Sequence, residues 1–229
     1  LCDVLIYGGS MTNIGYAAFQ NCARLENISI PPSVVAIGGS AFKNCVGLAE
    51  VYIPDSLVTI GDNAFENCAS LADIAIPNSV TSLGAYAFSG CTNLESATLP
   101  EGLTTVPTSL FNNCTALESI TIPDAVTEIR GSAFYNCSNL VNVAILGDSI
   151  ATIGGSSFQN CASLECVTIP ASVSLINSYA FKNCSSLTNV TFCGDMPTFS
   201  ISVFSGVSPD CTIYVPLSAD GWGTTYSGI

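Results

Sequence analysis

The sequence contains no histidine and very little positive charge. Of its 229 residues, 17 are acidic and only four are basic, which gives a formal net charge of −13 at pH 7. Neutralising the phosphates of a nucleic acid requires clusters of lysine and arginine, and an anionic membrane surface attracts basic segments for the same reason. The composition therefore argues against nucleic acid and anionic membrane surfaces as partners.

Long apolar runs and catalytic motifs are also missing. Pro, Gly, Ser, Thr or Asn interrupts every apolar stretch before it reaches the roughly 18 residues of a membrane-spanning helix, so we expect no membrane insertion. No G-x-S-x-G motif, phosphate-binding loop or dinucleotide fingerprint occurs. Catalysis needs a few unlike groups brought together. We therefore expect no enzymatic activity and no cofactor.

What the sequence does contain is a repeat of 23 residues. A phenylalanine recurs at this spacing, with one step of 24: Phe19, Phe42, Phe65, Phe88, Phe111, Phe134, Phe158 and Phe181. A cysteine follows three residues after each: Cys22, Cys45, Cys68, Cys91, Cys114, Cys137, Cys161 and Cys184. A leucine follows three residues later still, and an apolar-x-apolar-Pro segment usually ends the stretch. The one extra residue falls near Gly147, which we expect to lie in a loop.

The periodicity changes within one repeat. Residues 48–53 alternate as a short strand that ends before Pro54, and residues 57–60 form a second short extended segment. Residues 64–68 carry apolar side chains at helical spacing, which predicts a helical turn. The expected caps of these turns are Asn63 and, at the equivalent position of other repeats, Ser40, Ser109, Ser132 and Ser156.

A single unit of this kind cannot bury its apolar face alone, but stacked copies place each strand beside its copy in the next coil. We therefore predict a right-handed curved solenoid with a parallel β-sheet, short strands and helical turns. The array comprises about nine coils over residues 1–206, the first and last incomplete or degraded. Residues 207–229 are predicted to form a C-terminal capping segment.

The repeat resembles the BspA-type leucine-rich repeats, whose consensus is close to L-x-x-I-x-I-P-x-x-V-x-x-I-G-x-x-A-F-x-x-C. The match covers about residues 2 to 206, and the IYVP and GWG elements beyond it are similar to a terminal module of such arrays. The resemblance implies an extracellular or cell-surface location and a role in adhesion or host contact. It implies no particular ligand.

The repeated cysteine has three interpretations: a metal ligand, a disulfide or a buried thiol. Zinc sites take paired ligands in a tetrahedron, whereas one cysteine per coil forms a line, and no C-x-x-C occurs. Equivalent side chains of adjacent coils point the same way, about 4.8 Å apart, which is beyond the usual Cβ separation of a disulfide. We therefore expect a column of buried free thiols that pack as small apolar groups.

Four cysteines lie outside this register, namely Cys2, Cys166, Cys193 and Cys211. Cys2 is expected at a ragged end of the core, and Cys166 at an outward, exposed strand position. Cys193 and Cys211 flank the last degraded repeat. A disulfide between them would hold the cap in an oxidising compartment, and two free thiols are the alternative.

Outward strand positions form the broad face that solenoids usually offer to partners. The candidate binding residues on this face are Asn27, Glu50, Tyr52, Asp73, Thr98, Glu118, Thr121, Asn142, Thr168 and Asn189. The face is small, polar and mildly acidic, and Tyr52 is its candidate aromatic anchor. Acidic loop residues such as Asp124 and Asp148 form a partial column, but no calcium-binding pattern accompanies them, so we interpret them as solvated charge.

Three functions are consistent with this pattern. The first is an extracellular or cell-surface module that binds a protein or glycan through the strand face. The second is a building block of a filament or surface layer, in which free strand edges mediate self-association. The third is an intracellular scaffold, which mostly reduced cysteines would permit.

Overall fold

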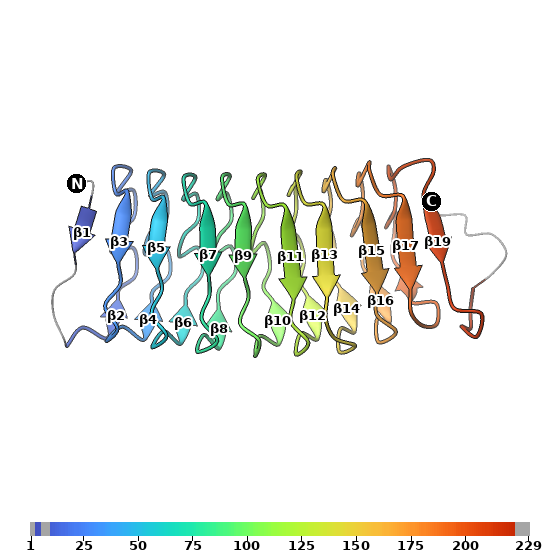
Figure 1. The fold of residues 1–229 in the computed structure, drawn as a ribbon, viewed down its shortest axis with the longest axis horizontal. Helices are drawn as coiled ribbons and strands as arrows, with labels where there is room; N and C mark the ends of the chain where they lie inside the picture. The colour runs from blue at the N-terminus through green and yellow to red at the C-terminus, as the bar shows by residue number, and fades with distance from the viewer. Residues whose placement is uncertain (1–2, 6–9, 223–229) are drawn as a thin grey trace.

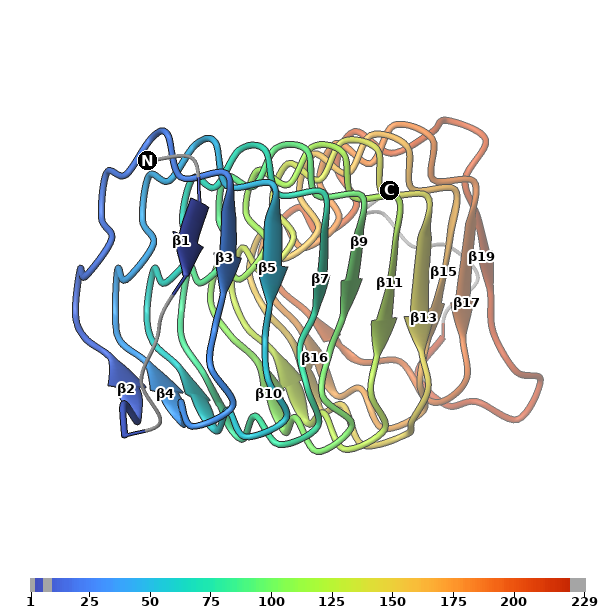
Figure 2. The same cartoon turned by 60° about the vertical axis from the view of Figure 1, so that its left-hand side comes forward.

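The protein is a stack of similar coils, seen in a computed structural model that describes residues 3–5 and 10–222 (Figure 1). The described residues contain nineteen short strands and no helix. Each coil contributes one strand to a front row and one two-residue strand to a second row, and Figure 2 shows the coils following one another along the axis. Among these residues no helix is long and apolar enough to cross a membrane. The predicted solenoid of short parallel strands is confirmed.

The strands of the two rows alternate along the chain. The front row comprises β1 (Asp3–Leu5), β3 (Asn27–Ser29), β5 (Glu50–Tyr52), β7 (Asp73–Ala75), β9 (Ser96–Thr98), β11 (Ser119–Ile122), β13 (Asn142–Ile145), β15 (Cys166–Ile169), β17 (Asn189–Phe192) and β19 (Thr212–Tyr214). The second row comprises β2 (Asn13–Ile14), β4 (Ala36–Ile37), β6 (Thr59–Ile60), β8 (Ser82–Leu83), β10 (Thr105–Val106), β12 (Glu128–Ile129), β14 (Thr152–Ile153), β16 (Leu175–Ile176) and β18 (Thr198–Phe199).

Paired strands are parallel and place equivalent repeat positions side by side. Asn27 pairs with Glu50, for example, and Ile120 with Val143. The front row is divided into three sheets, β1-β3-β5, β7-β9 and β11-β13-β15-β17-β19, and the second row into two, β2-β4-β6-β8 and β10-β12-β14-β16-β18. The register that the repeat predicts is therefore confirmed, and the breaks between sheets are a feature that the repeat did not predict.

The segment between the second strand and the cysteine is a series of tight turns instead of a helical turn. The N–H groups of Ser40, Phe42 and Asn44 donate to carbonyls of the next coil at 2.7–2.8 Å. The N–H groups between them, such as that of Ala41, donate to carbonyls three residues back in the same coil. Successive N–H groups therefore donate in turn to the next coil and to their own coil. In an α-helix, every interior N–H group donates to a carbonyl of the same helix.

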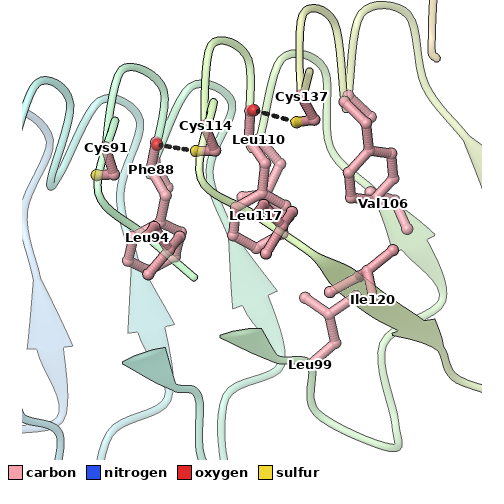
Figure 3. Close-up of a cluster of buried hydrophobic side chains, with 14 of the residues drawn as sticks. Phe88, Cys91, Leu94, Leu99, Val106, Leu110, Cys114, Leu117, Ile120 and Cys137 are labelled. Atoms are coloured by element: carbon pink, nitrogen blue, oxygen red, sulfur yellow. Dashed lines mark hydrogen bonds between the residues drawn. The ribbon is translucent and has the colours of Figure 1, made fainter. Parts of the chain in front are cut away.

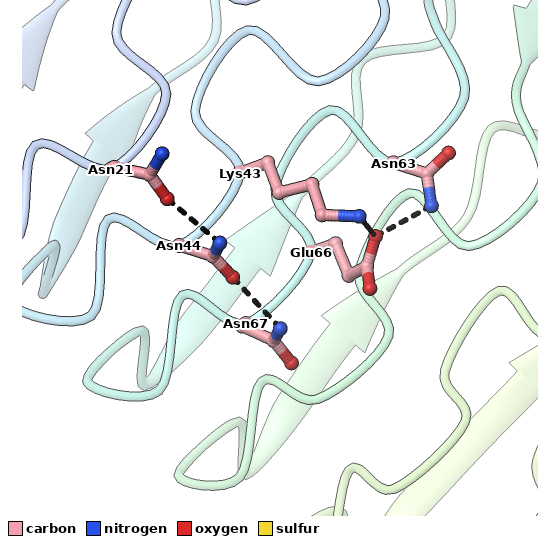
Figure 4. Close-up of polar contacts among 6 residues, drawn as sticks. All are labelled: Asn21, Lys43, Asn44, Asn63, Glu66 and Asn67. Atoms are coloured by element: carbon pink, nitrogen blue, oxygen red, sulfur yellow. Dashed lines mark hydrogen bonds and ion pairs between the residues drawn. The ribbon is translucent and has the colours of Figure 1, made fainter.

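The expected capping role of Asn63 and its equivalents is wrong. A capping residue has an extended backbone, whereas these residues have positive φ: Ser40 55°, Asn63 57°, Ser109 53°, Ser132 56° and Ser156 55°. The side chain of Asn63 donates a hydrogen bond to Glu66 (Figure 4). These residues therefore form the left-handed position of a tight turn.

The core lies between the two rows and the turns, and the repeated phenylalanines run through it as one column. Nine phenylalanine rings, from Phe19 to Phe204, stack in sequence with centroids 5.1–5.8 Å apart and interplanar angles of 1–19°. The repeated leucines from Leu25 to Leu187 are buried beside them. The extra residue near Gly147 lies in the loop after β13, as predicted, so the column continues from Phe134 to Phe158 without interruption.

The C-terminal part of the described chain continues the front row. β19 pairs in parallel with β17, which brings Thr212 beside Asn189. Trp222 packs against Phe192 with ring centroids 4.6 Å apart, and its indole N–H donates to the carbonyl of Gly194 at 3.3 Å. The predicted boundary near residue 206 thus falls between β18 and β19, and the segment after it is attached by strand pairing and by one tryptophan.

Candidate functional site

The candidate site is the strand face, defined as the outward side of the front row. All ten candidate binding residues are exposed: Asn27, Glu50, Tyr52, Asp73, Thr98, Glu118, Thr121, Asn142, Thr168 and Asn189. The alternation within each strand produces this result, because inward neighbours such as Ile28, Ile74 and Ile120 are buried. Nine of the candidates lie on front-row strands and Glu118 directly precedes β11, while the role of all ten in binding stays a prediction.

Tyrosines stand near the two ends of one register of this face. Tyr52 is 68% exposed on β5, and Tyr214 is 51% exposed on β19. The pairing of β17 with β19 puts Tyr214 beside Thr191, in the same register as Tyr52. The prediction missed Tyr214 because its segment was interpreted as a cap. The IYVP pattern of that segment repeats the apolar-x-apolar-Pro strand pattern and was the signal that could have located it.

The strand face is interrupted between β5 and β7 by a small cavity. Its volume is about 230 Å³, and it is lined by Glu50, Val51, Tyr52 and Asp73. Val51 is only partly buried, whereas its equivalent in the next coil, Ile74, is 3% exposed. Val51 is therefore within reach of the cavity, and its equivalents Ala97 and Val143 are also only partly buried.

Adjacent carboxylates coincide with both breaks in the front row. Glu50 and Asp73 are equivalent first residues of β5 and β7, and Glu95 and Glu118 directly precede β9 and β11. Like charges at neighbouring strand positions, about 4.8 Å apart, oppose pairing. The two front-row breaks thus coincide with residues that vary between coils, which a search for repeats does not detect.

The basic side chains with partners among the described residues are engaged away from this cavity. Lys43 forms an ion pair with Glu66 at 2.7 Å, and Arg130 with Glu128 at 3.2 Å. The ammonium of Lys182 lies 5.0 Å from the centre of the Tyr179 ring. Within the described part of the chain, no ion pair involves Glu50 or Asp73. The cavity consequently carries two carboxylates without a cationic partner.

The repeated cysteines form a buried column of free thiols, as predicted, from Cys45 to Cys184. The column has a further property that the sequence did not indicate. Each of these thiols donates to the carbonyl of the phenylalanine in the preceding coil at 3.0–3.3 Å, as Cys114 does to Phe88 (Figure 3). Cysteine is therefore the residue that fills a small apolar slot and also binds the neighbouring coil.

Burial makes these thiols chemically unreactive. It raises the pKa of Cys91, Cys137 and Cys184 to about 12, because the thiolate would lose its hydration. The pKa of Cys45 rises to about 11 for the same reason. Since the thiolate is the nucleophile and the metal ligand, the column offers neither function near neutral pH. Cys22, at the start of the column, is exposed.

Of the two alternatives for Cys193 and Cys211, a disulfide or two free thiols, this structure has the free thiols. The parallel pairing of β17 with β19 places Cys211 directly before β19, next to the start of β17, and Cys193 directly after β17. A four-residue strand separates the two positions by more than 13 Å at about 3.3 Å per residue, beyond the reach of a disulfide. Cys166 is exposed on β15, as expected, and Cys2 lies outside the described residues.

Three polar loop side chains accept hydrogen bonds from the backbone of the next coil. A carboxylate oxygen of Asp148 accepts the N–H of Ser172 at 2.8 Å, and one of Asp195 accepts the N–H of Asp220 at 2.8 Å. The side-chain oxygen of Asn78 accepts the N–H of Glu101 in the same way. In the part of the chain that the structure describes, no group of three or more Cys, Asp or Glu side chains could hold a metal ion. Asn78, Asp148 and Asp195 thus each connect their loop to the next one.

Comparison with known proteins relates the chain to repeat proteins of bacteria. A model of the BspA type leucine rich repeat region matches six copies, over residues 12–141 and 104–220. A leucine-rich repeat protein from Bacteroides ovatus has a similar structure, with a TM-score of 0.71 and 27% identity over 90% of this chain and 64% of that chain. One from T. pallidum gives a TM-score of 0.66 and 31% identity over 71% of this chain and 78% of that chain.

A third such protein, from Eubacterium ventriosum, gives a TM-score of 0.64 and 29% identity over 69% of this chain and 43% of that chain. The chain therefore spans less than two thirds of the length of the first and third of these proteins. No curated protein matches it.

Proposed function

Because the chain belongs to the BspA-type leucine-rich repeat family, we propose that it is a non-enzymatic, extracellular or cell-surface adhesion module that binds a protein or glycan through its strand face. The observation that carries the proposal is that all ten candidate residues are exposed and that nine of them lie on front-row strands. Side chains on the turn side are instead occupied with each other. The strand face thus presents exposed polar side chains that a partner can reach.

The chemistry of the face supports a polar partner. Its side chains are mainly threonine, serine and asparagine, which supply hydrogen bonds without a large apolar patch. Tyr52 and Tyr214 add two exposed aromatic rings near opposite ends, and aromatic residues often anchor protein interfaces and stack on sugars. The net charge of −13 disfavours acidic partners and favours neutral or basic ones.

The test is binding to an array of purified extracellular proteins and glycans. Thr98→Arg with Thr121→Arg places two bulky charged side chains at neighbouring exposed positions of the strand face. Thr81→Arg with Thr104→Arg is the matched control, because both threonines are exposed and lie outside the front row. We expect the first variant to lose binding to the array members that the parent chain binds, and the control to retain it. Equal loss in both variants, or retention in both, would contradict the proposal.

Self-association into a filament or surface layer is the competing function. It predicts that light scattering after size exclusion detects particles that grow with concentration, and that the same Thr98→Arg and Thr121→Arg change leaves end-to-end growth intact. A monodisperse chain near 23.6 kDa is the result that our proposal predicts. The proposed location is tested separately, by adding a protease to intact cells and measuring whether the chain is cleaved.

A further inference from the structure

We propose that the cavity between β5 and β7 is a binding site for a cationic side chain, arginine or lysine, of a protein partner. The inference rests on the proposed function, since it assigns a ligand chemistry to one point of the strand face. Three different features meet in this cavity: two carboxylates, an exposed aromatic ring and a partly exposed apolar side chain.

The first feature is uncompensated negative charge. Glu50 and Asp73 occupy equivalent positions on neighbouring strands, and the front row is interrupted between them. No ion pair involves either carboxylate within the described residues. A cation held between two carboxylates would relieve the repulsion that opposes pairing of β5 with β7. The gap is therefore a place where a cation gains two partners without displacing one.

The second and third features select an amphipathic cation over a bare ion. Tyr52 is 68% exposed and lines the cavity beside Glu50, so its ring face is free to contact a guanidinium or an ammonium. Val51 lines the same cavity and is only partly buried, and it can contact the methylene groups of a long basic side chain. A bare metal ion would use neither contact.

The size of the cavity agrees with a single side chain. Its volume of about 230 Å³ lies below the range of roughly 300–1,000 Å³ for pockets that enclose drug-sized ligands. The cavity also opens onto the strand face, so a partner that lies across the face can insert one residue. The basic side chain would fix the position of the partner along the row of coils.

The experiment titrates the full chain with the peptide acetyl-Gly-Arg-Gly-amide and follows backbone amide signals by nuclear magnetic resonance. The comparison peptide carries citrulline, which has nearly the shape of arginine without its charge. We expect saturable shifts centred on Val51, Tyr52 and Ile74, and binding of the citrulline peptide about tenfold weaker, the loss typical of a charge-assisted contact. Equal binding of the two peptides, or shifts centred elsewhere, would overturn the proposal.

Matched variants locate the effect. Glu50→Gln with Asp73→Asn should weaken binding of the arginine peptide by about tenfold or more. Glu101→Gln with Asp124→Asn removes two exposed acidic side chains of adjacent coils that lie in loops outside the cavity and are not candidate binding residues, and should leave binding unchanged. Tyr52→Ser should weaken binding and Tyr52→Phe should not, since both rings present a π face. Equal effects of the two acidic pairs would contradict the assignment.

Two further outcomes separate this inference from the proposed function. If calcium chloride alone produces the same saturable shifts at lower concentration than the peptide, the cavity is a metal site and the assignment to a basic side chain is wrong. If the arginine peptide fails to bind while Thr98→Arg with Thr121→Arg still abolishes binding to the array, the cavity assignment fails and the strand face retains its function. Peptide binding without any array binding would support the cavity assignment and contradict the proposed function.

Discussion

The two sides of the solenoid obey different rules. On the turn side almost every coil carries the same residue, and each side chain contacts its own copy in the next coil. Phenylalanine stacks on phenylalanine, a thiol donates to a carbonyl, and the side-chain amides of Asn21, Asn44 and Asn67 form a ladder at 2.8–2.9 Å (Figure 4). On the strand face the residue changes from coil to coil, and the side chains point to solvent. Repetition therefore marks the positions that stabilise the stack, and variation marks the positions free for a partner.

Alkaline pH should produce the largest loss of stability, through the buried thiols of the turn side. An unfolded thiol loses its proton near its ordinary pKa of 9.0, whereas folded Cys91, Cys137 and Cys184 keep theirs up to about pH 12. In this window the folded state binds more protons, so the free energy of unfolding falls as pH rises. The loss is about 1.4 kcal/mol per thiol per pH unit, and below pH 9 these thiols add no pH dependence.

Denaturant unfolding in reducing buffer at pH 7, 9 and 10 measures this loss. Cys166→Ser is the control, because it replaces an exposed thiol outside the column. A midpoint that stays constant between pH 9 and 10 would show that the column does not contribute as described.

Among single substitutions, one in the phenylalanine column should lower the free energy of unfolding the most. Phe111 is fully buried and stacks between Phe88 at 5.8 Å and Phe134 at 5.7 Å. Phe111→Ala should lower the free energy of unfolding by about 3–5 kcal/mol, the usual cost of emptying a buried aromatic site. Tyr52→Ala on the strand face should change the free energy of unfolding by no more than about 0.5 kcal/mol. Comparable losses in both variants, measured by chemical denaturation, would remove the distinction between the sides.

Two substitutions in the asparagine ladder should separate the contributions of backbone conformation and hydrogen bonding to the free energy of unfolding. Asn136 has a φ of 58°, and its amide donates to the side-chain oxygen of Asn113 at 2.9 Å. Asn136→Ala should cost about 2–3 kcal/mol, because it loses the bond and forces alanine into the left-handed region. Asn136→Gly should cost about 1 kcal/mol, because glycine accepts that conformation. If both variants cost the same, backbone strain does not explain the asparagine.

The thiol hydrogen bond should give the smallest of these effects. Cys114 is fully buried and donates to the carbonyl of Phe88 at 3.1 Å. Cys114→Ala should cost about 1–2 kcal/mol, from one lost bond and a small cavity, whereas Cys166→Ser should remain within about 0.5 kcal/mol. Thermal unfolding of the two variants side by side measures the difference. A neutral Cys114→Ala would mean that the thiol is only a space filler.

Much of the fold could be predicted because it depends on repetition. The spacing of the phenylalanines determined the number and register of the coils, and the alternation in segments such as residues 48–53 determined which side chains face outward. The exposed thiol of Cys166 and the loop at Gly147 followed from the same register. Each of these inferences needed only the pattern within one chain.

The parts that were missed depend on contacts between coils that the period does not encode. Spacing alone cannot distinguish a helical turn from tight turns whose N–H groups alternate between two coils, and the positive φ of Asn63 contradicted the expected cap. The sequence left the pairing of Cys193 and Cys211 open, because the pairing of β19 with β17, which separates the two residues, could not be predicted from the spacing. The cavity at Glu50 and Asp73 arises from two varying residues that become neighbours only after stacking.

A saturation scan of one central coil, residues 105–127, scored by resistance to protease, tests the difference between the two sides most directly. We predict that most substitutions at Phe111, Cys114 and Leu117 lower resistance, because these side chains are fully buried among their copies. Substitutions at Ser119 and Thr121 should be tolerated apart from proline, which removes a strand hydrogen bond. If Ser119 and Thr121 prove as intolerant as Phe111, the strand face is part of the stabilising framework and is not free for a partner.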